Sequence, residues 1–177
     1  ITSTFKKFKV EEGIFNTNGY TIQCGEFSVV GNSTINLSNS DIKVLRMFNL
    51  TSSNINSATS TIRLLGNYSS TVTNTSQVIL HNLINETSGG GGKVISGVGT
   101  YNKIVHKGGY FKLNSLTADS IVVESGRTLN LDGTVTVNDY LVMNGTCSLL
   151  SSLTGTGTLS SSTGNIVVNH TNIENIT

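Results

Sequence analysis

Short segments in which apolar and polar residues alternate strictly recur along the whole chain. Examples are STINLS at 33–38, STIRLL at 60–65 and GTVTVN at 133–138. Successive side chains of a strand point to opposite faces, so each segment has one buried side and one wet side. The chain offers no long stretch with apolar residues at i, i+3, i+4 and i+7, as an amphipathic helix requires. The sequence therefore predicts an all-β fold.

The spacing of these segments decides between two all-β architectures. Strand-like clusters recur every 6 to 8 residues or so, and similar patterns return after roughly 18 to 22, which matches three short strands per coil. Turn residues such as Asn-Gly at 18–19 and Asp-Gly at 132–133 separate them and could also close antiparallel hairpins. A β-sandwich, the alternative, favours 8–12-residue spacing with turn signals. We expect a parallel β-solenoid of about eight or nine coils, roughly 40 Å long at about 4.8 Å per coil.

Composition excludes several classes of partner. The chain has 177 residues, of which 12% are charged, and its formal net charge is +1. Such a balance gives no electrostatic reason to expect nucleic acid or an anionic membrane. No apolar run of about 18 residues is present, so no membrane insertion by a helix is predicted. We expect residues 1–177 to form a single domain, and the first residue, Ile1, indicates a processed product or a piece of a longer chain.

The two cysteines test the solenoid hypothesis. Cys24 and Cys147 are 147 − 24 = 123 residues apart, or about six coils, which is about 29 Å along the axis at about 4.8 Å per coil. A disulfide needs Cα atoms within about 7 Å. The solenoid therefore predicts that these two cysteines form no intramolecular bridge.

A glycine-rich stretch, INETSGGGGKVISGVGTYNK at 84–103, invites comparison with phosphate-binding loops. The Walker pattern needs a first glycine where this chain has Thr87 and a hydroxyl where it has Val94. No amphipathic helix follows to hold a phosphate at its N-terminus. We interpret the glycines as a sharp bend in the wall of the solenoid, and we expect no cofactor.

Several longer segments resemble a known type of domain. They are GIFNTNGYTIQCGEFSV (13–29), STINLSNSDIKV (33–44), the glycine-rich GGGGKVISGVGTYNKIVHKGGYFKLNS (89–115) and TGNIVVNHTNIENIT (163–177). Together they resemble right-handed parallel β-helix repeat domains of phage tail and virion surface proteins and of large bacterial surface adhesins. The resemblance implies a right-handed coil and transfers a fold without chemistry. Regularity is weaker around 67–76, where we expect a loop or a distorted coil.

Enzymatic β-helices cleave polysaccharides with acids on adjacent coils, and a glycosidase needs two carboxyl groups about 5 to 9.5 Å apart. Asp119, Glu124, Asp132 and Asp139 lie in one short span. Only Asp119 and Asp139 are about one coil apart and can lie in register, so they are the weak catalytic candidates. Solvated turn acids are the preferred interpretation, and we expect no enzyme and no metal site. The three histidines, at 81, 106 and 170, are scattered and predict no catalytic set.

The solvent-facing sides of the strands suggest that the chain binds glycans. Hydroxyl and amide groups hydrogen-bond sugars, and exposed tyrosines stack on sugar rings, so Tyr101, Tyr110 and Tyr140 are candidate glycan contacts. The long Thr-x-Thr stretch within Thr154–Thr163 is not repeated regularly along the sequence, which argues against the ladder of an ice-binding surface. Numerous Asn-x-Ser/Thr sequons permit glycosylation without showing it.

We expect a non-enzymatic structural or binding module of an extracellular assembly. A phage tail fibre, tail spike or virion surface component that contacts host-surface glycans is the first choice. The alternatives are a repeat segment of a secreted bacterial surface adhesin and a polysaccharide-degrading β-helix enzyme. The expected partners are surface carbohydrate and, as the resemblance to tail spikes implies, two further copies in a homotrimer. The expected location is extracellular, on a virion or a cell surface.

Overall fold

The structure is a computed structural model that describes residues 2–51, 54–66, 70–74, 79–88, 93–96 and 99–177. Nineteen strands and no helix make up the regular structure of these residues, which confirms the all-β prediction. The strands are β1 (Thr2–Val10), β2 (Ile14–Asn16), β3 (Thr21–Val29), β4 (Thr34–Asn36), β5 (Asp41–Leu50), β6 (Asn54–Asn56), β7 (Thr61–Leu64), β8 (Ser70–Asn74), β9 (Ile79–Asn85), β10 (Lys93–Ser96), β11 (Thr100–His106), β12 (Phe111–Leu113), β13 (Leu116–Val123), β14 (Thr128–Leu131), β15 (Thr134–Asn144), β16 (Ser151–Gly155), β17 (Thr158–Ser161), β18 (Asn165–Asn169) and β19 (Thr171–Ile173).

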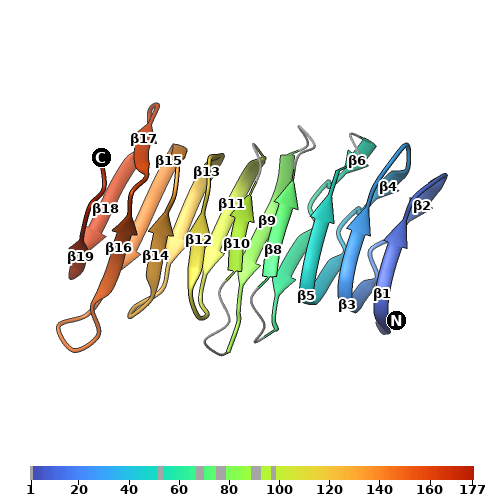
Figure 1. The fold of residues 1–177 in the computed structure, drawn as a ribbon, viewed down its shortest axis with the longest axis horizontal. Helices are drawn as coiled ribbons and strands as arrows, with labels where there is room; N and C mark the ends of the chain where they lie inside the picture. Colours follow the sequence, from blue (N-terminus) through green and yellow to red (C-terminus); the bar gives the residue numbers. More distant parts are fainter. Residues whose placement is uncertain (1, 52–53, 67–69, 75–78, 89–92, 97–98) are drawn as a thin grey trace.

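The strands stack along one axis as a parallel β-solenoid, with the N-terminus at one end and the C-terminus at the other (Figure 1). Every pairing between the named strands is parallel, which excludes the antiparallel sandwich. The pairings define three faces. Face 1 contains 2–5, 21–24, 41–44, 61–64, 82–85, 103–106, 120–123, 140–144 and 165–169. Face 2 contains 7–10, 26–29, 47–50, 72–74, 93–96, 111–113, 128–131, 151–155 and 171–173. Face 3 contains 14–16, 34–36, 54–56, 79–80, 100–101, 116–118, 134–137 and 158–161.

The spacing along the sequence of one inward row on face 1 gives the number of residues in each coil. Strand register stacks Ile22, Ile42, Ile62, Leu83, Ile104, Ile121, Leu141 and Ile166. The steps between neighbours are 20, 20, 21, 21, 17, 20 and 25 residues. The solenoid has about seven turns, close to the eight or nine expected. Seven steps of about 4.8 Å span about 34 Å.

The corner at which the chain turns sharply changes along the rod. In the N-terminal part, β1, β3 and β5 run continuously over faces 1 and 2. The turn then falls between faces 3 and 1, where Asn18, Ser38 and Ala58 each take a positive φ of 40–51°. From β9 onwards the long strands cover faces 3 and 1 instead, and the turn falls between faces 1 and 2. This second kind of corner is where the chain forms the hollow described below.

Inward side chains fill the interior as stacked rows. Phe8, Phe27 and Phe48 occupy one register position on face 2, with ring centroids 5.1 and 5.5 Å apart. Offset stacking of aromatic rings adds to the burial of their apolar surface. The interior is closed to water, since most aliphatic side chains of the rows are fully buried.

The remaining sequence predictions concern the two cysteines, residues 67–76, the glycine run and membrane-spanning helices. Cys24 and Cys147 are both free, as the solenoid hypothesis requires. Within 67–76, where a loop or distorted coil was expected, residues 70–74 form strand β8. The glycine run at 89–92 lies outside the described residues, so its predicted bend is not tested. Among the described residues, no helix is long and apolar enough to cross a membrane.

Candidate functional site

The surface is recessed where one coil is shorter than the next. The coil from Ile104 to Ile121 has 17 residues, against 20 for the coil from Ile121 to Leu141. Three residues fewer shorten its perimeter by about 10 Å. Two hollows lie on this coil and its successor. One holds about 270 Å³ and the other about 200 Å³.

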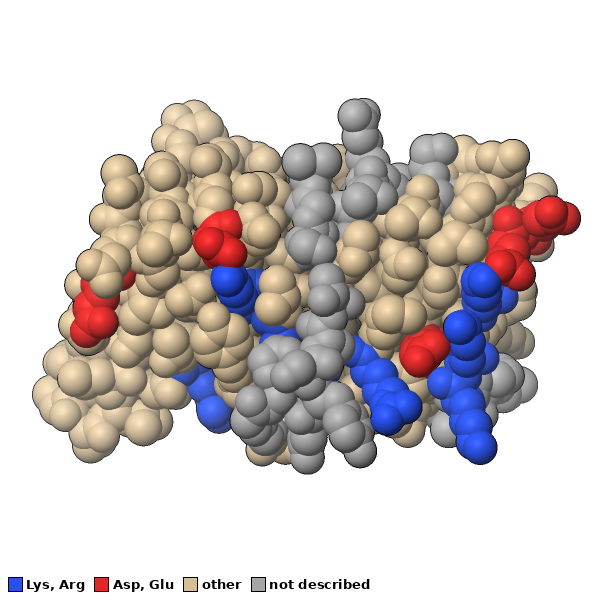
Figure 2. Space-filling model, viewed as in Figure 1, with Lys and Arg blue, Asp and Glu red and all other residues tan. Residues whose placement is uncertain are grey.

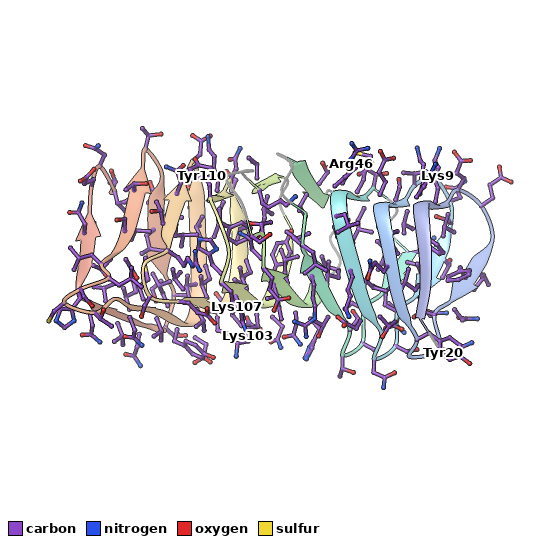
Figure 3. The ribbon with its side chains drawn as sticks, turned by 90° about the horizontal axis from the view of Figure 1, so that it is seen from below. Lys9, Tyr20, Arg46, Lys103, Lys107 and Tyr110 are labelled. Atoms are coloured by element: carbon purple, nitrogen blue, oxygen red, sulfur yellow. The ribbon has the colours of Figure 1, made fainter. Side chains whose placement is uncertain are left out.

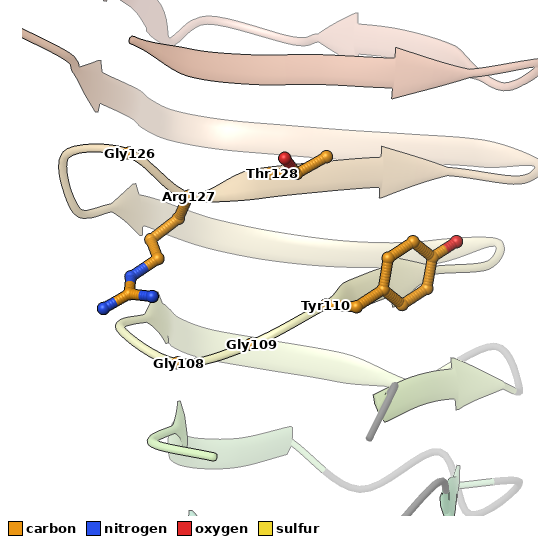
Figure 4. A pocket seen from close by; sticks show the side chains of 6 residues that line it. All are labelled: Gly108, Gly109, Tyr110, Gly126, Arg127 and Thr128. Carbon is orange, nitrogen blue, oxygen red and sulfur yellow. The ribbon is translucent and has the colours of Figure 1, made fainter. Parts of the chain in front are cut away.

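The larger hollow lies at the corner between faces 1 and 2 (Figure 4). Its lining residues come from two successive turns, and they are Gly108, Gly109, Tyr110, Gly126, Arg127 and Thr128. In Figure 4 the Arg127 side chain reaches from its own coil toward the segment of Gly108 and Gly109, and the ring of Tyr110 lies beside that segment. The volume is just under the range of about 300–1,000 Å³ that is typical of small-molecule sites. It suits one sugar ring better than a larger ligand.

Glycines in the two turns that line the hollow allow these turns to lie close to neighbouring atoms. A Cβ on Gly108 would lie 2.3 Å from the backbone nitrogen of Thr87, so no side chain fits there without moving the backbone. Gly126 has a φ of +72°, which favours glycine, and a Cβ there would meet the side chain of Leu149 at 2.4 Å. Glycine at these two positions therefore lets each turn run close to its neighbour.

Tyr110 and Arg127 supply the chemistry of the hollow. Tyr110 is 39% exposed, so part of its ring is available to a ligand. Arg127 is partly buried, and its Nε atom is buried without a hydrogen-bond partner among the described residues. Within the same part of the chain, Arg127 makes no ion pair. Figure 4 shows the guanidinium and the ring at opposite sides of the hollow, so a ligand between them could contact both a positive charge and an aromatic face.

A buried polar chain lies directly inside this corner. Asn85 and His106 are fully buried and occupy neighbouring positions in a row that is otherwise filled by Leu64 and Val123. His106 Nε2 lies 3.0 Å from the carbonyl oxygen of Thr128, and its Nδ1 lies 3.2 Å from Asn85 Nδ2. The carbonyl can only accept, so Nε2 carries the proton and Nδ1 accepts from the Asn85 amide.

This chain ties the hollow to the core. Asn85 Oδ1 accepts from the backbone N–H of Thr87 at 3.3 Å, and Thr87 Oγ1 accepts from the N–H of Gly109 at 2.9 Å. The floor glycine and Thr128 are thus both held by one hydrogen-bonded network. Rigid support of this kind keeps a binding surface in shape before the ligand arrives.

Burial lowers the pKa of His106 to about 4. The first cause is desolvation, which disfavours the imidazolium, and the charge of nearby Arg127 acts in the same direction, while the bond to Thr128 opposes both. A proton on Nδ1 would also face the Asn85 amide donor. His106 is therefore neutral at physiological pH and serves the structure of the corner rather than proton transfer.

The acids near the hollow already have basic partners. Glu124 lies 3.7 Å from Lys107, and Asp132 lies 2.6 Å from Lys112. Figure 2 shows the same sparse pattern on its face of the rod, with acidic side chains beside basic ones on a largely uncharged surface. In Figure 3 the side chains of Lys103 and Lys107 project on the side of the rod opposite Tyr110. Arg127 is thus the only cationic residue that lines the hollow.

The three tyrosines that the sequence suggested as glycan contacts differ in burial and position. Tyr101 is fully buried, so no glycan can reach its ring, and we drop it from the candidate contacts. Tyr140 is partly exposed on face 1, in register with Ser120 and Asn165. Tyr110 alone of the three lines a described hollow.

The two weak catalytic candidates fall on adjacent coils, as expected. Strands β13 and β15 shift register between Ala118 and Ser120, and this shift sets Asp119 against the segment of Asn138 and Asp139. Asp119 Oδ1 accepts a hydrogen bond from Asn138 Nδ2 at 3.1 Å, and Asp139 is exposed. Neither residue lines either of the two described hollows.

Sequence reasoning missed a row of hydroxyl groups on face 3. Strand register stacks Thr100, Thr117, Thr136 and Ser160, and beside them Thr134 and Thr158. The smaller hollow lies within this surface, between Ser115 and Thr136. Steps of 17, 19 and 24 residues separate the members of the longer row, so no fixed period marks them in the sequence.

The fold defines the class of protein, a parallel β-solenoid with sparsely charged outer faces and shallow hollows. Comparison with protein families, with curated proteins and with solved structures finds no match for this chain.

Proposed function

We propose that this solenoid is a non-enzymatic structural and binding module of an extracellular assembly, and that it contacts glycans. A virion surface part such as a phage tail fibre or tail spike, facing its host's surface, is the preferred setting, and a bacterial surface adhesin is the alternative. The observation that supports binding is the hollow of Tyr110 and Arg127 over its glycine floor. The hydroxyl rows of face 3 offer a second surface for hydrogen bonds to sugars.

The architecture supports a scaffold role. The core is a set of stacked apolar rows, and the outward residues are mainly short and polar. A ligand can lie along several coils of such a rod without any change of its shape. Binding of this kind depends on many weak contacts and on one or two better ones in hollows. Tyr110 and Arg127 are the best placed residues for those better contacts.

Glycan binding is tested with immobilised surface polysaccharides and the wild-type protein. Tyr110→Ala removes the aromatic face, and because the ring is already partly packed, we expect a loss of about 5- to 10-fold in affinity. Tyr20→Ala is the matched control, since Tyr20 is a 48% exposed tyrosine outside the hollow. Equal binding by all three proteins would remove the hollow from the proposal.

The rival enzymatic function has a direct test. The protein is incubated with capsular and pectin-like polymers, and new reducing or unsaturated ends are measured. Turnover that disappears in Asp119→Asn or Asp139→Asn would overturn the non-enzymatic proposal. Unchanged polymers with retained binding support it.

Oligomeric state separates the two settings. Tail spikes of the kind this sequence resembles are usually trimers, so a homotrimer in light scattering supports a virion component. A monomer supports the adhesin alternative. The measurement uses the whole chain at several concentrations, because weak association depends on concentration.

A further inference from the structure

The hollow contains one charge without a counter-charge. Arg127 lines it, while the neighbouring acids Glu124 and Asp132 are held by Lys107 and Lys112. Within the described residues, no acid forms an ion pair with Arg127. An anion in the hollow would supply the counter-charge to its guanidinium.

The geometry of arginine narrows the kind of anion. A guanidinium binds a carboxylate with two parallel N–H groups, and its two terminal nitrogens form one such fork. Tyr110 lines the other side of the same hollow and presents a partly exposed ring. A ligand that satisfies both residues carries a carboxylate directly on a ring with an apolar face. Acidic sugars, such as hexuronic and sialic acids, have this combination.

The size and the floor of the hollow agree with such a ligand. About 270 Å³ accommodates one ring, and Gly108, Gly109 and Gly126 place no side chain in its way. The network through Asn85 and His106 holds both sides of the corner. The hollow is therefore formed before binding, and this lowers the entropic cost of association.

We propose that this hollow selects glycans that contain a carboxylate-bearing sugar, with Arg127 paired to the carboxylate and Tyr110 against the sugar ring. The inference rests on the proposed glycan-binding function and names its ligand class. Recognition is non-covalent, and Arg127 recognises the negative charge of the sugar. Neutral glycans of the same shape bind more weakly.

The test compares matched oligosaccharides by calorimetry or interferometry. Tetragalacturonate is set against its full methyl ester, and sialyllactose against lactose, so that each pair differs mainly in the carboxylate or the sugar that carries it. We expect wild type to prefer the acidic member of at least one pair by about 10- to 100-fold, as a charge-assisted pair predicts. Arg127→Gln removes this preference, and Arg127→Lys restores only part of it. Lys103→Gln, on the opposite side of the rod, leaves it unchanged.

The outcomes distinguish the two levels of the proposal. Equal binding of acidic and neutral glycans that is lost in Tyr110→Ala overturns the carboxylate inference and retains glycan binding. An acidic preference that survives in Arg127→Gln moves recognition away from the hollow and overturns the inference. Tighter binding of a sulfated oligosaccharide than of either carboxylate also overturns it. If no glycan binds wild type on any surface tested, the proposed function itself fails.

Discussion

Replacement of the buried pair Asn85 and His106 tests how the corner beneath the hollow is built. Their row on face 1 reads Leu64, Asn85, His106, Val123 along the stack, so valine at both positions continues the aliphatic row. The variants are Asn85→Val, His106→Val and the double variant. Each single change breaks the hydrogen bond between Asn85 and His106 and one further bond, from Thr87 in Asn85→Val or to Thr128 in His106→Val, while the double change removes both members of the pair.

The expected energies follow from these contacts. His106→Val takes the acceptor from Asn85 Nδ2 and the donor from the Thr128 carbonyl, bonds of 3.2 and 3.0 Å. An unsatisfied buried group costs about 1–3 kcal/mol, so each single variant should lose about that much stability. Removal of both partners should cost less than the sum of the single changes by about 1–2 kcal/mol. Denaturant unfolding followed by circular dichroism measures this coupling.

The pH dependence gives the same experiment a second readout. The folded pKa of His106 is about 4, below the ordinary histidine value of 6.5, so below pH 6.5 the unfolded chain binds a proton that the folded chain does not. Stability from this group is present above pH 6.5 and is lost as the pH falls toward 4. Between pH 7 and pH 5 the loss should be about 2 kcal/mol. His106→Val should unfold with a correspondingly smaller pH slope.

Two results would refute this reasoning. Strict additivity of the single variants would show that Asn85 and His106 do not share a hydrogen bond. A slope between pH 7 and pH 5 that is the same in wild type and in His106→Val would show that His106 titrates normally and is not buried. The first result concerns the pair alone, whereas the second would also weaken the preformed hollow.

Two further predictions concern the coil itself. Burial raises the pKa of Cys24 to about 12, so at pH 8 a thiol reagent should label only the exposed Cys147, and both thiols should react in denaturant; two reactive thiols in the native protein would contradict the burial. At Gly66 an added Cβ would lie 1.5 Å from the carbonyl oxygen of Leu45, so Gly66→Ala should cost at least about 3 kcal/mol of unfolding free energy, as for overpacking. The matched change Gly13→Ala meets no atom within 4 Å and keeps only the strain of a φ of +80°, about 1 kcal/mol, and equal costs at the two glycines would contradict the close approach of coils at Gly66.

The wall of the solenoid could be predicted from the sequence because it depends on a local rule. Residues two apart on a strand share a face, so the alternating pattern predicts that Ile42 and Val44 both point inward, and the structure buries both. The number of turns was less accessible, because steps of 17 to 25 residues do not reveal an exact count. The placement of Asp119 and Asp139 on adjacent coils could be predicted from the sequence, since these residues lie one average coil apart. The burial of Tyr101 was not, because its outward or inward direction depends on where strand β11 bends between faces 3 and 1.

The hollow could not be predicted, because no single segment encodes it. Tyr110 follows a pair of glycines in one turn, and Arg127 follows Gly126 in the next, and each turn alone is an ordinary corner. They form a site because strand register stacks the two turns on adjacent coils, and the turn of Tyr110, residues 107–110, is one residue shorter than the turn of Arg127, residues 124–128. A strand residue is specified by its neighbours at i ± 2, whereas this site depends on two stacked turns of different length and on a buried pair, Asn85 and His106, that replaces aliphatic residues. In a solenoid, therefore, breaks in the regular pattern are the better guide to function: stacked turns of unequal length line the hollow, and polar residues in an apolar row hold its edges.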